Sequence, residues 1–287
     1  MKGRVWFETL GCKANQYDTE KLRALLEGLG WVPVSEPGDA DLVLVNTCAV
    51  TSVAEKKSRQ ALSRARKLAP RAKVAALGCW AKRLENLGKP FPQTCDLALG
   101  EGAREEGFHR LLQALGEEDP GGFPFLKNYR QRHRAFLKVQ DGCDFHCTYC
   151  VIPSLRGPSR SRPLPDVLEE AASLVRAGTR ELVLTGVCLG DWREKDQGLE
   201  KLVQGLLELK GTFRLRLSSV DPERVTPALL EVLGGAGTCR VCPPLLLPLQ
   251  SGSDRVLKRM GRRYRAGDFR SILKRAGRVF GPSFSFT

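Results

Sequence analysis

The 287-residue sequence has no apolar run long enough to cross a bilayer, which excludes a protein held in a membrane by a spanning helix. It also shows no secretory leader, because an acidic residue, Glu8, follows the start of the chain too soon for a signal peptide. Internal repeats and low-complexity tracts are lacking as well, so a repeat array is not expected. Together these features predict a cytoplasmic protein with no membrane partner.

Acidic residues are comparatively few. Lysine and arginine number 46 and aspartate and glutamate 32, which gives a formal net charge of +14. This excess predicts a polyanionic partner such as nucleic acid, although a solvated, arginine-rich surface would give the same composition. The apolar fraction of 42% is that of a globular protein, and the length suffices for two domains.

Strand-like and helix-like segments alternate through residues 1–118. Strands are predicted at residues 4–10, 41–46, 73–77 and 96–99, with apolar helical faces between them. One helix is predicted to begin at an N-cap, Ser52, with Glu55 completing a capping box, and to end before Pro70. Its apolar face would include Ala61 and Leu68. The pattern predicts an α/β fold whose N-terminal domain is a doubly wound parallel sheet.

Residues 119–133 interrupt this pattern with a Pro/Gly-rich and then basic stretch, which predicts a linker. Alternation resumes in a second domain, residues 134–287. Strands are predicted at residues 136–140, 181–187 and 213–217, with further candidates at 245–250 and 283–287, and a helix at 163–177. Such repeated units favour a TIM-like barrel or part of one, in which chemistry lies at the carboxyl ends of the strands.

Ten cysteines are more than a protein of a reducing compartment usually needs, so metal binding or catalysis is favoured over disulfides. Three of them, Cys143, Cys147 and Cys150, follow the predicted strand at 136–140, and we call them the loop thiol group. Thiolates suit iron–sulfur clusters and zinc, and three on one loop can hold a cubane cluster while leaving its fourth iron open. Zinc with His146 or a distant cysteine as fourth ligand, or three core cysteines, are the alternatives.

Cys12, Cys48 and Cys79 are far apart in sequence, yet each lies just beyond a predicted strand; we call them the N-terminal thiol group. Because the carboxyl ends of parallel strands share one edge, these thiolates would converge on a second cluster. Three separately buried small residues are the alternative. Of the other cysteines, Cys95 precedes its strand and is expected to be structural, and no role is predicted for Cys188, Cys239 and Cys242.

The loop thiol group has an aromatic residue, Tyr149, before its last cysteine and a predicted strand before its first. In this it resembles the radical S-adenosylmethionine (SAM) superfamily. The resemblance implies a [4Fe-4S] cluster whose open iron takes the amino and carboxylate groups of SAM. Reductive cleavage of SAM would then give a 5′-deoxyadenosyl radical.

Six segments resemble, in order, the sequence blocks of the methylthiotransferase family within that superfamily. They are residues 9–20, 46–50, 77–79, 156–163, 217–219 and 249–254, so the resemblance spans essentially the whole chain. The opening Gly-Cys-Lys-Ala-Asn-Gln-Tyr-Asp at 11–18 is similar to the branch acting on N6-threonylcarbamoyladenosine at tRNA position 37. A methylthiotransferase acting on a ribosomal-protein aspartate, and a zinc-stabilised RNA-binding module without catalysis, are the alternatives.

The family resemblance implies two [4Fe-4S] clusters with different tasks. The N-terminal thiol group would hold an auxiliary cluster that carries the sulfur to be inserted, and one SAM would methylate a sulfide there. The loop thiol group would use a second SAM to make the radical that abstracts hydrogen from adenine C2. The implied partners are tRNA, an electron-donor protein and a sulfur source, and the sequence identifies neither of the last two.

Further residues are expected near the cofactor or the RNA. Tyr149 would contact the SAM adenine, unless it is simply an exposed loop aromatic. Polar residues at strand ends would meet the polar groups of SAM, with turn chemistry as the alternative; they are Ser218, Ser219, Gln250 and Ser251. Arg156, Arg160 and Arg162 would contact tRNA phosphates or the cofactor carboxylate, or be surface arginines. A basic face is expected at 255–265, including Arg262.

The resemblance also implies more chain than these 287 residues contain. Family members continue into the end of the barrel and a small RNA-binding TRAM domain, so the barrel is expected to be incomplete. The family usually has a histidine within the segment that here reads Pro-Pro-Leu-Leu-Leu-Pro at 243–248.

Overall fold

The computed structural model describes residues 2–100, 105–121, 125–129, 133–235, 239–281 and 285–286. The chain forms two compact units, of which the first comprises residues 1–126 with 154–156 and the second residues 127–153 with 157–287. The predicted limits, a first domain ending at 118 and a linker at 119–133, stay predictions. Part of that linker, residues 122–124 and 130–132, lies outside the described residues.

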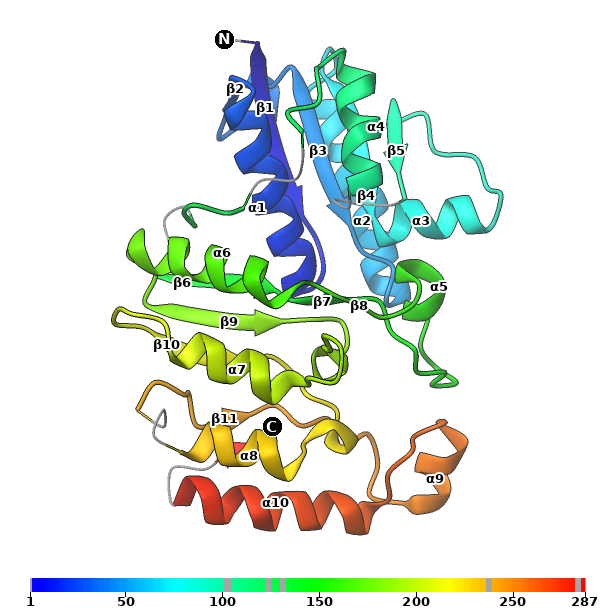
Figure 1. The fold of residues 1–287 in the computed structure, drawn as a ribbon. Coiled ribbons are helices and arrows are strands. Elements are labelled where there is room, and N and C mark those ends of the chain that lie inside the picture. The colour runs from blue at the N-terminus through cyan, green and yellow to red at the C-terminus, as the bar shows by residue number, and fades with distance from the viewer. Residues whose placement is uncertain are drawn as a thin grey trace. The chain divides into compact units, whose positions relative to one another are not determined.

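A five-stranded sheet is the centre of the first unit, with the strand order β2-β1-β3-β4-β5 (Figure 1). In that order the strands are β2 (Trp31–Pro33), β1 (Gly3–Thr9), β3 (Leu42–Thr47), β4 (Lys73–Gly78) and β5 (Leu97–Leu99). Neighbouring strands all pair in parallel, so their carboxyl ends share one edge. This confirms the predicted parallel α/β domain, although the pattern missed β2, which has three residues.

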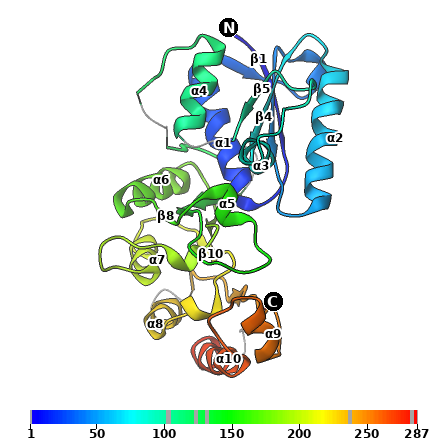
Figure 2. The ribbon, with the colours of Figure 1, turned by 90° about the vertical axis from the view of Figure 1, so that its right-hand side faces the viewer.

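Helices cover both faces of this sheet, as Figure 2 shows. On one face α1 (Lys13–Gly28) and α4 (Glu105–Leu115) pack on the sheet, with Leu26 and Phe108 in one core cluster with Leu44 of β3. Alternate residues of a strand point to opposite faces. Val43 and Val45, which are also fully buried, therefore face α2 (Ser52–Leu68) on the other side. The short α3 (Cys79–Asn86) follows β4 directly.

The start of α2 lies one residue from its predicted cap. Thr51 is extended, and its side chain accepts a hydrogen bond from the amide three residues on, so it is the N-cap. The prediction of Ser52 as N-cap is wrong, because Ser52 is already the first helical residue. Leu68 is also misassigned, since it is 50% exposed, and Ser58 and Leu62 lie on the buried face instead.

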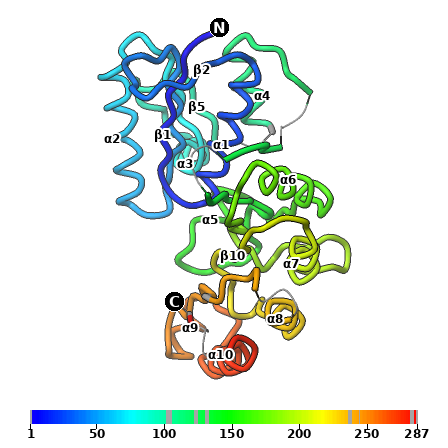
Figure 3. Tube along the Cα trace, turned by 90° about the vertical axis from the view of Figure 1, so that its left-hand side faces the viewer, coloured from blue at the N-terminus to red at the C-terminus, as the bar shows by residue number. Residues whose placement is uncertain are grey.

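In the second unit a parallel sheet of order β10-β9-β6 is built from β6 (Arg134–Lys138), β9 (Glu181–Thr185) and β10 (Arg214–Leu217). Each strand leads into a helix: α6 (Leu164–Arg176), α7 (Leu199–Leu207) and α8 (Pro227–Gly234), which are seen nearly end-on in Figure 3. Smaller elements are β7 (Gln140–Asp141) paired antiparallel with β8 (Arg160–Ser161), and β11 (Pro244–Leu245) paired parallel with β12 (Ser285–Phe286). This unit also contains α9 (Asp254–Arg259), α10 (Ala266–Phe280) and the 3-10 turns η2 (Leu189–Asp191) and η3 (Pro222–Arg224). The 3-10 turn η1 (Pro37–Asp39) lies in the first unit, and α5 (Ile152–Arg156) contributes residues 154–156 to that unit. The strand–helix repeat confirms the predicted partial barrel.

Three predicted strands of this unit are shorter in the structure. The strand predicted at 181–187 ends at Thr185. Of the candidate at 245–250 only Leu245 is in a strand, because Pro248 and the left-handed Gln250, at φ +63°, end the extended run. Of the candidate at 283–287, residues 285–286 form β12, and the rest lies outside the described residues. In the described part of the chain, no helix combines the length and apolarity that a membrane span requires.

Candidate metal centres

The N-terminal thiol group lies at the carboxyl edge of the first sheet. Cys12 follows β1 as the residue before α1, Cys48 follows β3 directly, and Cys79 is the first residue of α3 after β4. The strands β1, β3 and β4 are adjacent and parallel. The sequence prediction that strand ends bring these cysteines to one edge therefore describes the geometry correctly.

Two observations show that the three thiols lie near one another. A Cβ atom placed on Gly11, next to Cys12, would lie 3.0 Å from the Cys48 Sγ. Burial raises the pKa of the Cys79 thiol, the neighbouring Arg156 guanidinium lowers it, and charge on Cys12 and Cys48 raises it further. Cys48 and Cys79 are buried, whereas Cys12 is exposed, so solvent reaches the group at Cys12.

Buried polar side chains hold the loops that carry these thiols. Asn15 donates hydrogen bonds to the Leu10 carbonyl at 2.8 Å and to the Thr47 carbonyl at 3.1 Å, which joins the loops after β1 and β3. The Ser58 hydroxyl accepts from the Cys48 amide at 3.0 Å and lies 2.9 Å from the Cys48 carbonyl oxygen. These hydrogen bonds hold the loops after β1 and β3 in place at the sheet edge.

Arg156, which the sequence predicts at tRNA phosphates or the cofactor carboxylate, or as a surface arginine, belongs to the first unit and is not at the surface. It is 5% exposed, donates to Asn15 Oδ1, and pairs with Asp18 at 3.7 Å. Arg162, in the second unit, is also not a free surface arginine, because it pairs with the fully buried Glu170 at 2.6 Å. Arg156 places a positive charge beside the N-terminal thiol group, which would offset the charge of three thiolates.

The loop thiol group is gathered by a tight chain reversal after β7. Gly142 has φ +75°, the Cys143 amide donates to the Gly157 carbonyl at 3.1 Å, and the Cys150 amide donates to the Cys147 carbonyl at 3.0 Å. All three thiols are partly buried. Burial raises the pKa of the Cys150 thiol, and charge on Cys147 and Cys143 raises it further, so the three sulfurs lie within electrostatic reach.

Hydrogen-bond donors point at the sulfurs of this loop. The Arg262 Nη1 donates to Cys147 Sγ at 3.3 Å, and the Phe145 amide donates to Cys143 Sγ at 3.4 Å. The sequence predicts Arg262 on a basic face, but its side chain is 5% exposed and forms an ion pair with Asp221. Donors to sulfur stabilise an anionic, thiolate-bound centre.

The five residues expected at SAM are not joined to one another by hydrogen bonds. Tyr149 is 51% exposed, and Ser219 and Gln250 are exposed too. The Ser251 hydroxyl accepts from the Ser253 amide at 3.2 Å. Ser218 differs from the others, because it is buried at the end of β10 and its Oγ has no hydrogen-bond partner within the described residues.

The donor chemistry and spacing of both thiol groups fit iron–sulfur clusters. Soft cysteine thiolates are the usual protein ligands of such clusters. In the described part of the chain, neither group has its three sulfurs within the 4.8 Å of one another that suits a single ion. A multi-iron centre, which holds its thiolates further apart, agrees better with this spacing than one zinc ion.

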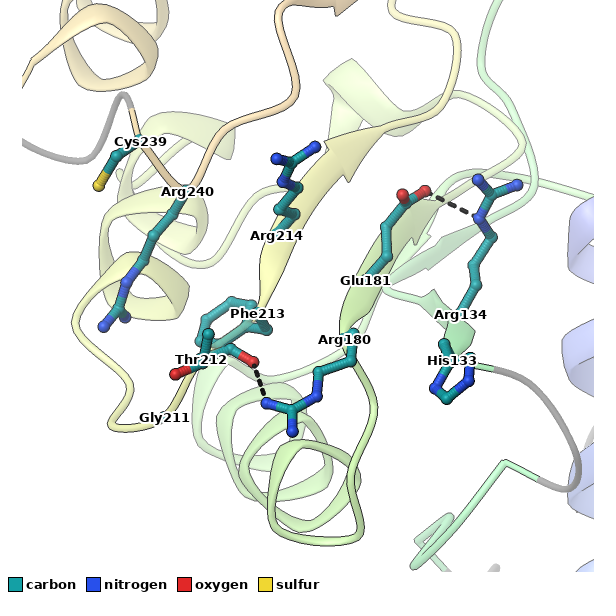
Figure 4. A pocket seen from close by; sticks show the side chains of 10 residues that line it. All are labelled: His133, Arg134, Arg180, Glu181, Gly211, Thr212, Phe213, Arg214, Cys239 and Arg240. Atoms are coloured by element: carbon teal, nitrogen blue, oxygen red, sulfur yellow. Dashed lines mark hydrogen bonds and ion pairs between the residues drawn. The ribbon is translucent and has the colours of Figure 1, made fainter.

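A hollow of about 600 Å³ lies at the opposite, amino ends of β6, β9 and β10 (Figure 4). Its four arginines are Arg134, Arg180, Arg214 and Arg240. Arg134 pairs with Glu181 at 2.8 Å, and Arg180 donates to the Thr212 carbonyl at 3.4 Å. This basic hollow lies at the amino ends of the strands, so it is separate from the cysteine loop, which follows their carboxyl ends. In barrels of this kind the chemistry lies at the carboxyl ends.

Comparison with known families agrees with this geometry. Residues 137–287 match the Radical SAM superfamily, and residues 4–100 match a family described as Uncharacterized protein family UPF0004. Two solved structures share the fold over nearly all of this chain. The cobalamin-dependent SAM radical enzyme OxsB has a TM-score of 0.65 at 10% identity, covering 99% of this chain and 48% of its own. The radical SAM methyltransferase TsrM from Kitasatospora setae has a TM-score of 0.64 at 14% identity, covering 99% and 66%.

Curated relatives are similar along the whole chain. Threonylcarbamoyladenosine tRNA methylthiotransferase MtaB of Chlamydia pneumoniae is 36% identical over 290 residues, which is 100% of this chain and 67% of that protein. The protein of the same name from Thermotoga maritima is 37% identical, over 99% and 66%. A tRNA-2-methylthio-N(6)-dimethylallyladenosine synthase of Cereibacter sphaeroides is 34% identical, over 95% and 65%. The chain thus spans about two thirds of the length of these relatives.

The fold and the cysteine loop define a radical SAM protein. Within this superfamily, the chain belongs to the methylthiotransferase family. The predicted family and its transferase class are confirmed, and the family implies SAM and a [4Fe-4S] cluster as cofactors.

Proposed function

We propose that the protein is a tRNA methylthiotransferase that inserts a methylthio group at C2 of N6-threonylcarbamoyladenosine at tRNA position 37. The names of the relatives from Chlamydia and Thermotoga support this base, as does the opening motif at residues 11–18. The net charge of +14 supports a polyanionic substrate. A tRNA substrate places the reaction in the cytoplasm.

The observation that carries the proposal is the presence of two separate groups of three thiols, one in each unit. We assign an auxiliary [4Fe-4S] cluster to Cys12, Cys48 and Cys79, and the SAM-binding cluster to the loop thiol group. When bound, the loop cluster supplies the electron that cleaves SAM, and the auxiliary cluster supplies the sulfur. The protein holds each centre by three thiolates, which leaves one iron of each cluster without a protein ligand.

Buried cations balance these centres. Arg262 donates to the Cys147 sulfur and is itself held by Asp221, so it stabilises the negative charge of the loop centre. Arg156 does the same beside Cys79. Both guanidiniums are enclosed, so they act in a low-dielectric surrounding where a charge has a larger effect than in water.

We assign SAM contacts to Tyr149 and to four polar side chains, Ser218, Ser219, Gln250 and Ser251. Ser218 has the strongest support, because a buried hydroxyl normally has a hydrogen-bond partner and its Oγ has none in the described part of the chain. A ligand that reaches the end of β10 would supply that partner.

The first test is iron and labile sulfide per chain after anaerobic reconstitution. The wild type should hold about eight irons, and a Cys→Ala triple variant of either thiol group about four, since each [4Fe-4S] site takes four. Cys95→Ala is the matched control, because Cys95 is partly buried but belongs to neither group. About four irons, lost only when the loop thiols are replaced, would remove the auxiliary cluster from the proposal.

The second test identifies the substrate. The reconstituted protein is given SAM, a reductant and either tRNA bearing threonylcarbamoyladenosine, tRNA bearing dimethylallyladenosine, or the ribosomal protein. Mass spectrometry of the digested products should show the methylthio group on threonylcarbamoyladenosine alone. Modification of either other substrate instead would overturn the assignment of the base, and a zinc-loaded, colourless protein without iron would overturn the catalytic proposal itself.

A further inference from the structure

A second set of possible ligands shares one cysteine with the loop thiol group. The sulfurs of Cys143 and Cys188 and a carboxylate oxygen of Asp191 all lie within 4.8 Å of one another. Cys188 follows β9 and Asp191 ends η2, while Cys143 follows β6 and β7. Because β6 and β9 are neighbouring parallel strands, their carboxyl ends bring these three side chains together.

Two side chains of this set, those of Cys188 and Asp191, are buried, and hydrogen bonds hold their backbone in place. Cys188 is 2% exposed and the Asp191 side chain 7%. The Cys188 amide donates to the buried Gln140 Oε1 at 2.8 Å, and the Asp191 amide donates to the Cys188 carbonyl at 2.9 Å. The ligand atoms are therefore positioned by the backbone, as in a preformed site.

The Asp191 carboxylate supplies an independent sign of a missing ligand. Its Oδ1 is bound by Arg224 at 2.6 Å, whereas its buried Oδ2 has no nitrogen or oxygen hydrogen-bond partner within the described residues, and the weakly donating Cys188 thiol lies near the carboxylate. A buried carboxylate oxygen without a partner is costly. A cation bound to Asp191 and to the adjacent sulfurs would remove that cost.

The donor set indicates which cation fits. Two thiolates and one carboxylate suit Zn²⁺, with water as fourth ligand in a tetrahedral site. The ion and the Arg224 guanidinium together balance the three negative charges of the donors. Both thiols must be deprotonated to bind the ion, so binding is favoured as pH rises.

We propose that Cys143, Cys188 and Asp191 form a binding site for a single thiophilic divalent cation such as Zn²⁺. A second consequence rests on the proposed function: the ion and the loop cluster exclude each other, because both require Cys143. Zinc therefore competes with iron–sulfur assembly in this protein, through residues outside the cysteine loop.

The site is tested with Co²⁺ as a spectroscopic probe for zinc, titrated anaerobically into cluster-free, full-length chain. Thiolate-to-cobalt absorption should appear at one ion per chain and disappear when Zn²⁺ is added. Cys188→Ser and Asp191→Asn should each weaken cobalt binding by at least about tenfold. Cys147→Ser and Cys150→Ser are the matched controls and should keep it.

Circular dichroism shows whether each variant is folded. If Cys188→Ser unfolds the loop, Asp191→Asn still tests the site, because it keeps the side-chain size. Cobalt binding that survives in both Cys188→Ser and Asp191→Asn would overturn the site. The same holds if binding is lost in Cys147→Ser and Cys150→Ser, because the ion would then occupy the cluster thiols.

Competition is measured by adding Zn²⁺ before iron and sulfide. The wild type should then take up about four fewer irons per chain, whereas Cys188→Ser should be unaffected. Equal iron uptake with and without zinc would overturn the exclusion. A protein that takes up no iron even without zinc would count against the proposed function, while the cobalt titration would still decide the cation site.

Discussion

Gly142 sets the course of the loop that carries Cys143, and replacing it with alanine should remove the loop cluster. The residue has φ +75°, in the left-handed region that favours glycine. A Cβ atom there would lie 1.9 Å from the Pro158 carbonyl oxygen and 2.7 Å from that of Gly157. The Gly157 oxygen also accepts from the Cys143 amide at 3.1 Å, so the segments cannot separate without moving this ligand.

The size of the effect follows from two contributions. Left-handed backbone costs a residue with a Cβ about 1–2 kcal/mol. Relieving the contact with backbone atoms should add about 1–3 kcal/mol, as for an overpacked site, so Gly142→Ala should destabilise the loop by roughly 2–5 kcal/mol in all. Gly178→Ala is the matched control. Gly178 has φ +96°, but an added Cβ atom would meet nothing within 4 Å, so this variant should show only the cost of left-handed backbone.

The assay combines the urea midpoint of the cluster-free protein with iron content after reconstitution. Gly142→Ala should lose about four irons per chain and keep the iron of the proposed N-terminal cluster, whereas Gly178→Ala should lose no iron. If Gly142→Ala matched Gly178→Ala in both iron content and urea midpoint, the reasoning that this glycine positions Cys143 would be refuted.

Three further predictions concern other supporting residues. Ser58→Ala should cost about 1–3 kcal/mol and selectively lower iron in the N-terminal site, because the hydroxyl bonds the backbone of Cys48; iron analysis and denaturant unfolding check this. Arg262→Gln should make the reduction potential of the loop cluster more negative, since a cation that donates to Cys147 Sγ is removed; a potentiometric titration followed by electron paramagnetic resonance would contradict this by showing no shift. Burial raises the pKa of Glu181, but hydrogen bonds and charge from two arginines outweigh this and hold it below its usual value. The stabilising effect of Glu181 is thus present above its unfolded pKa of about 4.3 and lost as pH falls through its lower folded pKa. Glu181→Gln should therefore reduce the loss in free energy of unfolding that is measured as pH is lowered from 7.

The sequence by itself determined the fold class and the grouping of the cysteines. Cys143, Cys147 and Cys150 are close because they share one short loop. Cys12, Cys48 and Cys79 could be brought together by reasoning alone, because parallel strands place their carboxyl ends at one edge whatever the details of packing. The same reasoning applies to Cys188, which directly follows the strand predicted at 181–187, although the sequence pattern assigns no role to it.

Only the tertiary structure decided which charges and donors surround these thiols. Arg156 and Arg262 look like surface cations in a basic sequence, yet each is buried beside a different thiol group and held by an acidic partner far along the chain. Cys188 reaches Cys143 because β9 lies next to β6, and Asp191 joins them through the turn of η2. Sequence periodicity reports the faces of single elements, whereas such encounters depend on strand order and loop course, which are set by contacts distant in sequence.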